Sequence, residues 1–214
     1  MNKKKLNLLL LGSFFILFFS CSDDEIGEIK GSQSPFGEVG NEIDWKVGQF
    51  GISDANMVVT GLEGGVSTFE CSFTPSDNTI VDLFKMVPTN RFPGTLNING
   101  NTVSAKVNAK ITDNGAQVIF NDGSKLTLVD YDAKVGDIYS AKVDGVTLQN
   151  EVVERSTEDD YYWGGMYIKV ITVRYKSQTP GVSHVDAFYN HKFALVGLAL
   201  TFEDGSLKYA GIEF

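Results

Sequence analysis

The feature that most constrains the fold is an unbroken alternation of apolar and polar residues from Thr102 to Ile111. Alternate side chains of a β-strand point to the same face, so this pattern predicts a strand with one buried and one solvated face. Pairs of residues that permit a positive φ recur between the apolar runs and are typical of tight hairpin turns. These pairs are Asn99-Gly100, Asn114-Gly115, Asp122-Gly123, Asp144-Gly145 and Asp204-Gly205.

Short apolar or alternating runs bounded by turn residues predict further strands along the chain. The candidate strands are 57–62, 66–73, 80–87, 94–98, 116–120, 125–129, 138–143, 146–153, 166–175, 182–189, 193–202 and 207–214. Residues 79–86 fit a short helix equally well, because their apolar positions suit both periods. Both faces of 166–175 are apolar, which predicts one long strand covered on both sides.

So many antiparallel strands with short connections would expose apolar surface and free edges in one flat sheet. We therefore predict an all-β domain with few or no helices, built as a strongly curved antiparallel sheet that is barrel-like or a half-barrel. A β-sandwich is the alternative. The domain is expected to span residues 45–214, either as one unit or as two sub-parts, 45–133 and 134–214.

The N-terminus has the layout of a secretory signal, with Lys3, Lys4 and Lys5 ahead of an apolar run over residues 6–19. As a helix this run would rise about 21 Å, which is short of the roughly 30 Å hydrocarbon core of a bilayer. A cleaved signal peptide over residues 1–20 is therefore favoured over a permanent transmembrane anchor.

The apolar run ends at Ser20-Cys21, which resembles the lipobox recognised by lipoprotein signal peptidase. The resemblance implies that Cys21 is acylated and holds the chain to membrane lipid. Several acyl chains on one cysteine give lasting attachment. The alternative is an ordinary signal peptide with a chance cysteine beside the cleavage point.

The residues after Cys21 resemble the acidic tag that directs some Gram-negative lipoproteins to the outer face of the outer membrane. They are Ser22, Asp23, Asp24 and Glu25. The resemblance implies an outer-membrane lipoprotein that is exposed at the cell surface. A solvated acidic start to a linker explains the same residues.

Residues 21–44 have few apolar side chains and predict a flexible acidic tether. Removal of residues 1–20 takes away three lysines and leaves 15 basic against 27 acidic residues, a net charge near −12. Such a charge repels phosphate backbones, so nucleic acid is not an expected partner. With Cys21 acylated, Cys71 has no intramolecular partner, and its place between Phe69 and Phe73 on one strand face predicts a buried thiol.

The C-terminal half resembles a group of exported bacterial lipoproteins related to the half-barrels of LolA-like lipoprotein carriers. The motifs are Lys134-Val-Gly-Asp137 and the strand at 188–196, where Ala194 replaces an expected glycine. The resemblance implies a strongly curved antiparallel sheet. A carrier function does not transfer with it, because a fold does not specify a function.

The chain lacks the sequence signatures of the common enzyme and cofactor sites. The two histidines, His184 and His191, are too few to define a metal site, so no metal or cofactor is expected. We predict a membrane-anchored, non-catalytic β-domain for binding or envelope structure. The alternative is a glycan hydrolase that uses two carboxylates. A pocket with two facing carboxylates would favour hydrolysis, and an apolar cavity without such a pair would favour binding.

The remaining candidate contact site is Tyr161, Tyr162 and Trp163, which follow three acidic residues and precede a pair of glycines. Exposed aromatic rings beside carboxylates can stack on sugars or anchor a protein, so an envelope glycan or protein is a candidate partner. The alternative is that the rings cover one end of a barrel while Gly164-Gly165 turns the chain.

Overall fold

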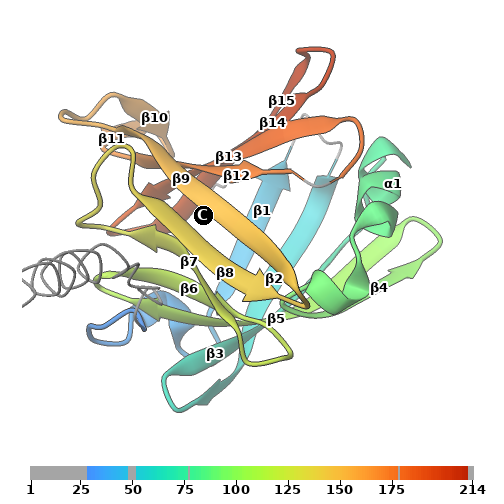
Figure 1. Ribbon diagram of the computed structural model, residues 1–214, viewed down its shortest axis with the longest axis horizontal. Coiled ribbons are helices and arrows are strands. Elements are labelled where there is room, and N and C mark those ends of the chain that lie inside the picture. Colours follow the sequence, from blue (N-terminus) through green and yellow to red (C-terminus); the bar gives the residue numbers. More distant parts are fainter. Residues whose placement is uncertain (1–27, 48–51, 77, 178, 212–214) are drawn as a thin grey trace, which may run out of the picture.

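The computed structural model describes residues 28–47, 52–76, 78–177 and 179–211, which form two curved antiparallel sheets that face each other (Figure 1). The first sheet has the order β1-β2-β3-β5-β6-β7, with β4 also paired to β5. Its strands are β1 (Glu42–Val47), β2 (Ile52–Glu63), β3 (Val66–Phe73), β4 (Gly94–Asn99), β5 (Thr102–Thr112), β6 (Gly115–Ile119) and β7 (Lys125–Asp130).

The second sheet has the order β15-β14-β13-β12-β9-β8. Its strands are β8 (Ile138–Val143), β9 (Val146–Arg155), β12 (Ile171–Lys176), β13 (Val182–Asn190), β14 (Ala194–Phe202) and β15 (Leu207–Gly211). The edges of the two sheets approach each other at β7 and β8 and again at β1 and β15. The pairing does not close into one barrel, so the prediction of an all-β, curved antiparallel fold is confirmed in its open or sandwich form.

The flawless alternation at 102–111 forms β5, the strand at which three neighbours meet. Four of the five predicted turn pairs have a glycine with positive φ, as hairpin turns require: Gly100, Gly123, Gly145 and Gly205. Gly115 differs from these four, because its φ is not positive and a Cβ there would lie 2.2 Å from the carbonyl oxygen of Val129. A close approach of two strands, rather than a positive φ, requires this glycine.

At the β7 edge, hydrogen bonds from side chains of the second sheet to the backbone of β7 join the two sheets, where no strand pairing does. Tyr139, Asn150 and Tyr175 lie opposite one another on three adjacent strands of the second sheet. Asn150 donates to the carbonyl of Thr127 at 3.0 Å, and the Tyr175 hydroxyl donates to the carbonyl of Leu128 at 3.2 Å. The Tyr139 hydroxyl accepts from the backbone N–H of Asp130 at 3.2 Å. This row therefore satisfies backbone groups on an edge strand that would otherwise lack partners.

Residues 28–41 form an N-terminal strap on the first sheet, so the expectation of a flexible tether up to residue 44 needs correction. Ile29 is buried, Ser34 donates its N–H to Ile111 at 2.9 Å, and the 3-10 helix η1 (Pro35–Gly37) accepts the Ser67 hydroxyl at Gly37. Gly40 then donates to Val59 at 2.9 Å. A few apolar residues and backbone hydrogen bonds suffice to order a segment whose composition is otherwise that of a linker.

Three other segments differ from the expected strands. Residues 78–86 form helix α1 (Asn78–Met86), which resolves the open choice at this segment in favour of a helix. The expected long strand 166–175 is two strands, β11 (Met166–Ile168) and β12, which belong to different sheets. β11 pairs with β10 (Tyr161–Trp163) through the positive-φ turn at Gly164-Gly165. Both faces of 166–175 are apolar because two short strands pack separately.

The helix α1 and the β10–β11 hairpin lie at opposite ends of the molecule (Figure 1). A second short 3-10 helix, η3 (Thr89–Arg91), follows α1. Within the described residues, no helix is long and apolar enough to cross a bilayer.

Candidate functional site

Two apolar cavities lie between the sheets, and they are the main candidate site. The first has a volume of about 340 Å³ and is bounded by the apolar face of α1 and by inward-facing residues of β2, β3, β13 and β14. Its wall includes Ala55, Phe73, Leu83, Phe84, Leu198 and Leu200, and Phe84 packs edge-on against Phe73 at 5.6 Å. Ser177 and Thr179, which follow β12, are its polar residues.

The second cavity, of about 270 Å³, lies beyond the first along the same strands. Its wall comes from β1, β2, β3, β5, β6 and β7, and from the ends of β13 and β14 with the turn between them, and Phe36 of the strap contributes to it. The lining includes Met57, Phe69, Ile111, Leu128, Phe193 and Leu195. No charged side chain lines either cavity among the described residues.

Side chains that point into the space between two sheets are normally fully buried, but those that face these cavities keep some solvent exposure. Met57, Leu128, Leu195, Leu198 and Leu200 are all half-buried. Protein interiors are normally packed as densely as organic crystals, so inward-facing leucines that keep solvent exposure mark unfilled space. An apolar ligand between the sheets would remove this surface from water.

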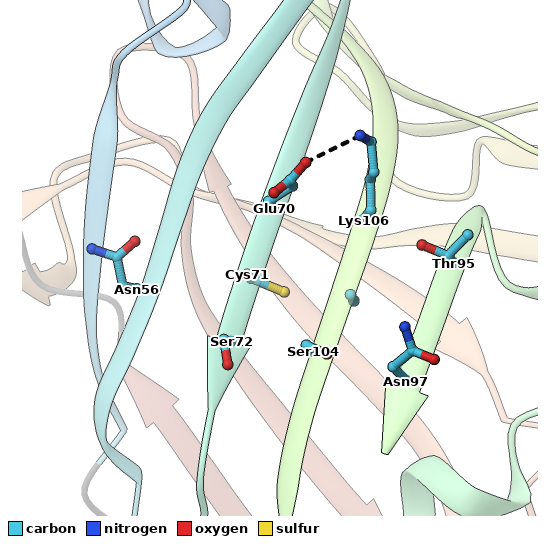
Figure 2. Close-up of a pocket in the computed structure, with 9 residues that line it drawn as sticks. Asn56, Glu70, Cys71, Ser72, Thr95, Asn97, Ser104 and Lys106 are labelled. Atoms are coloured by element: carbon cyan, nitrogen blue, oxygen red, sulfur yellow. Dashed lines mark ion pairs between the residues drawn. The ribbon is translucent and has the colours of Figure 1, made fainter. Parts of the chain in front are cut away.

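A polar groove on the outer face of the first sheet is the second candidate (Figure 2). Its outward-facing residues come from β2 to β5 and are Asn56, Glu70, Ser72, Thr95, Asn97, Ser104 and Lys106. Glu70 is its one carboxylate, and it pairs with Lys106 at 3.0 Å. Hydrogen bonds from Lys106 and Thr60 lower the pKa of Glu70, whereas a general acid requires a raised pKa.

A further groove, on the outer face of the second sheet, has a row of charges across β9, β12 and β13. Arg174 lies between Glu151 and Asp186, and it binds both Asp186 oxygens, at 2.7 and 2.8 Å. His184 is 3.7 Å from the same carboxylate. Asp186 is held by the guanidinium, so this groove does not present two carboxylates that face each other across open space.

The aromatic residues predicted at 161–163 are divided between two faces of the β10–β11 hairpin. Trp163 is buried, with its ring 4.5 Å from that of Phe193, and Tyr161 stacks on Phe188 at 5.2 Å. Phe188 lies between the inward-facing Ala187 and Tyr189, so the hairpin covers the outer face of the second sheet. Trp163 and Tyr161 thus pack on the outer face of a sheet instead of at a barrel end, and Gly164-Gly165 turns the chain as the alternative had it.

The other face of this hairpin carries an exposed aromatic pair that the sequence did not reveal. Tyr162 and Tyr167 are 65% and 63% exposed, and they lie opposite each other with their rings 5.3 Å apart. Tyr167 lay within an expected continuous strand, so nothing in the sequence linked it to Tyr162. The acidic residues Glu158, Asp159 and Asp160 directly before β10 are also exposed.

Cys71 lies on the strand face that it shares with Phe69 and Phe73, but it is half-buried, and it borders both the second cavity and the outer polar groove (Figure 2). Desolvation raises the pKa of its thiol. His184 lies in β13 and His191 in the exposed turn before β14, and the described residues contain no cluster suited to a metal ion. The predicted lipidation site Cys21 and the tag Ser22, Asp23, Asp24 and Glu25 lie outside the described residues.

Comparison of the whole chain with known proteins finds no matching family model, no similar curated protein and no similar solved structure.

Proposed function

We propose that this chain is a lipid-anchored, non-catalytic binding protein of the outer membrane whose β-domain holds an apolar ligand between its two sheets. The observation that carries the proposal is the pair of apolar cavities with half-buried leucine walls. Concave, mostly apolar sites of a few hundred Å³ are typical of small-molecule binding.

The same observation favours binding over glycan hydrolysis. A glycosidase needs two carboxylates about 5–10 Å apart across a cleft. The first outer groove has a single carboxylate, in an ion pair with Lys106. At the second groove Arg174 lies between the two carboxylates, Glu151 and Asp186, and binds Asp186. Neither cavity between the sheets is lined by a described carboxylate.

Binding is tested with the mature chain carrying Cys21→Ser, so that no attached acyl chain competes. An environment-sensitive naphthalene dye should fluoresce strongly with this protein and be displaced by a long-chain alcohol. Leu200→Trp, which fills the first cavity, should weaken dye binding at least tenfold. Thr201→Trp on the neighbouring outward-facing position is the matched control and should leave it unchanged. Absence of dye binding by the folded protein would contradict the proposal.

The anchor is supported by the basic start, the apolar run and the Ser20-Cys21 junction. Cells fed labelled palmitate should incorporate label into the wild-type chain and not into Cys21→Ala. Equal incorporation would rule out Cys21 as the anchor. If the acidic tag directs surface display, replacement of Asp23, Asp24 and Glu25 by alanine should protect the protein from protease added to intact cells.

A second candidate function is contact with an envelope glycan or protein through Tyr162 and Tyr167. Two aromatic rings that stay more than 60% exposed beside three acidic residues favour it. Tyr162→Ala should weaken binding to isolated envelope glycans without lowering the melting temperature. Trp163→Ala should do the reverse, because Trp163 is buried against Phe193. Equal glycan binding by wild type and Tyr162→Ala would exclude this contact.

A further inference from the structure

We propose that the ligand is a single unbranched hydrocarbon chain that enters beneath α1 and extends through both cavities. This inference rests on the proposed binding function and specifies the ligand class and its path. It follows from how the two cavities are placed relative to each other, from the residues that separate them and from the position of their polar residues.

The cavities are consecutive along three strands. On β2 the inward-facing Ala55 lines the first cavity, and the next inward-facing residue, Met57, lines the second. On β3 the same step leads from Phe73 to Cys71. On β14 it leads from Leu198 to Leu195 across a β-bulge. Two residues along a strand span about 7 Å, so only side chains separate the two spaces.

The residues at this boundary can move aside. Leu198 lines the first cavity and packs against two core clusters, and Met57, which comes from the opposite sheet, lines the second cavity. Both are half-buried, and methionine has an unbranched side chain that adapts to irregular gaps. Rotation of these two side chains would join the cavities without a change in the backbone.

The shape of the joined space selects the ligand class. Each cavity alone is at the lower limit for small-molecule sites, and no described residue lines both, so side chains divide the space between them. A flexible chain can pass such a constriction, whereas a fused-ring compound of the same volume cannot. The absence of charged residues among the described lining residues requires the buried part of the ligand to be pure hydrocarbon.

The polar residues of the first cavity determine which end of the ligand lies near α1. Ser177 and Thr179 follow β12 at the α1 end of the first cavity, and the far end of the second is walled by Phe36 and Phe193. A polar headgroup would therefore remain near α1, in reach of water, while the tail points towards Phe36. Leu83 and Phe84 of α1 would cover the first part of the chain.

The test measures the affinity of octanol, decanol, dodecanol, tetradecanol and hexadecanol by displacement of the naphthalene dye. Each methylene that becomes buried should strengthen binding about fourfold. With the Cys21→Ser chain we expect this increase to continue to the long alcohols. In Leu195→Trp, which fills only the second cavity, the increase should stop at a shorter alcohol while octanol binds as in wild type. Leu200→Trp, the matched change in the first cavity, should weaken every alcohol.

Reactivity of Cys71 gives a second readout that does not depend on these variants. In Cys21→Ser this is the only thiol of the chain, and it lines the second cavity. A saturating long alcohol should slow its reaction with a small apolar thiosulfonate at least tenfold, whereas saturating octanol should not. If affinity stops rising at the same chain length in wild type and Leu195→Trp, the ligand is confined to the first cavity and this inference fails while the binding function stands. If no alcohol displaces the dye, both fail.

Discussion

The two sides of the space between the sheets are built from the same kind of strand and yet are filled differently. On the side of β7, β8, β9 and β12, Val129, Val143, Val152 and Val173 have no exposed surface. On the side of β2, β3, β13 and β14, inward-facing residues such as Leu195, Leu198 and Leu200 remain half-buried around cavities. We call these the packed side and the hollow side.

The difference shows that alternation alone does not determine packing density. The packed side combines small β-branched residues with the row of Tyr139, Asn150 and Tyr175, whose hydrogen bonds fix the second sheet against β7. On the hollow side a helix and a strap cover the ends of the space while its interior stays open. The packed side therefore stabilises the fold, and the hollow side has room for a ligand.

The largest expected contrast is in alkaline solution, because buried tyrosines belong mainly to the packed side. Burial raises the pKa of Tyr131 and Tyr139 to about 12, and it raises those of Tyr175 and Tyr189 further. The unfolded chain loses these protons near pH 10, so the stabilisation is complete below pH 10 and is lost as the pH rises through about 12. Chemical unfolding at increasing pH should show a loss of several kcal/mol.

Tyr139→Phe should make this decline less steep, since it removes one of the titrating groups. Tyr162→Phe, which alters an exposed ring on the β10–β11 hairpin, is the control and should leave the slope unchanged. A protein whose stability is constant from pH 9 to 12 would contradict the assignment of buried hydroxyls to the packed side.

Asn150→Ala tests the hydrogen bonds that join the sheets. It leaves the buried carbonyl of Thr127 without this donor and should cost about 2–3 kcal/mol of unfolding free energy. Gln149→Ala, at the adjacent exposed position, should change stability by no more than about 0.5 kcal/mol. Urea denaturation of the two variants measures the difference, and similar values would mean that the row contributes little.

Val173→Ala and Val185→Ala compare the two sides with one and the same chemical change. Val173 is fully buried on the packed side, so its truncation should cost about 2 kcal/mol. Val185 already borders the first cavity, so the same truncation should cost less than about 1 kcal/mol. Equal losses in thermal or urea unfolding would show that the hollow side is as densely packed as the other.

The smallest expected effect is a gain in the free energy of unfolding. Ala194 starts β14 beside the second cavity and has a φ of 56°, a left-handed conformation that costs a residue with a Cβ about 1 kcal/mol. Ala194→Gly removes this cost but makes the unfolded chain more flexible, so a net gain of about 0.5 kcal/mol is expected. A lower melting temperature than wild type would show that the methyl group contributes more to the cavity wall than the strain costs.

Much of the fold could be predicted from the sequence because strand alternation and turn glycines are local signals. The strands around 102–111 and most of the hairpin turns follow directly from them. The expected glycine at position 194 also marked a real constraint, since Ala194 has a positive φ. Local signals fail where burial is decided by distant contacts, as for the strap at 28–41 and for the break at Lys169-Val170 between β11 and β12.

The candidate site could not be predicted because its residues resemble ordinary core residues. Leu198 and Leu200 alternate with small outward-facing neighbours as in any half-buried strand, and only the assembled sheets show that the space before them is unfilled. The aromatic residues 161–163 are a visible sequence feature, but their division into a buried and an exposed face depends on the register of a hairpin with Tyr167.

The strap gives the domain a particular response to mechanical force. If Cys21 is held in the membrane, tension reaches the domain through residues 28–41, whose hydrogen bonds to β5, β3 and β2 follow one another along the chain. The strap has few hydrogen bonds compared with the strand pairs of the sheets, so it is the part of the domain that would detach first. Phe36, which forms part of the second cavity's wall, would leave with it. Loss of Phe36 from this wall would open the far end of the space between the sheets.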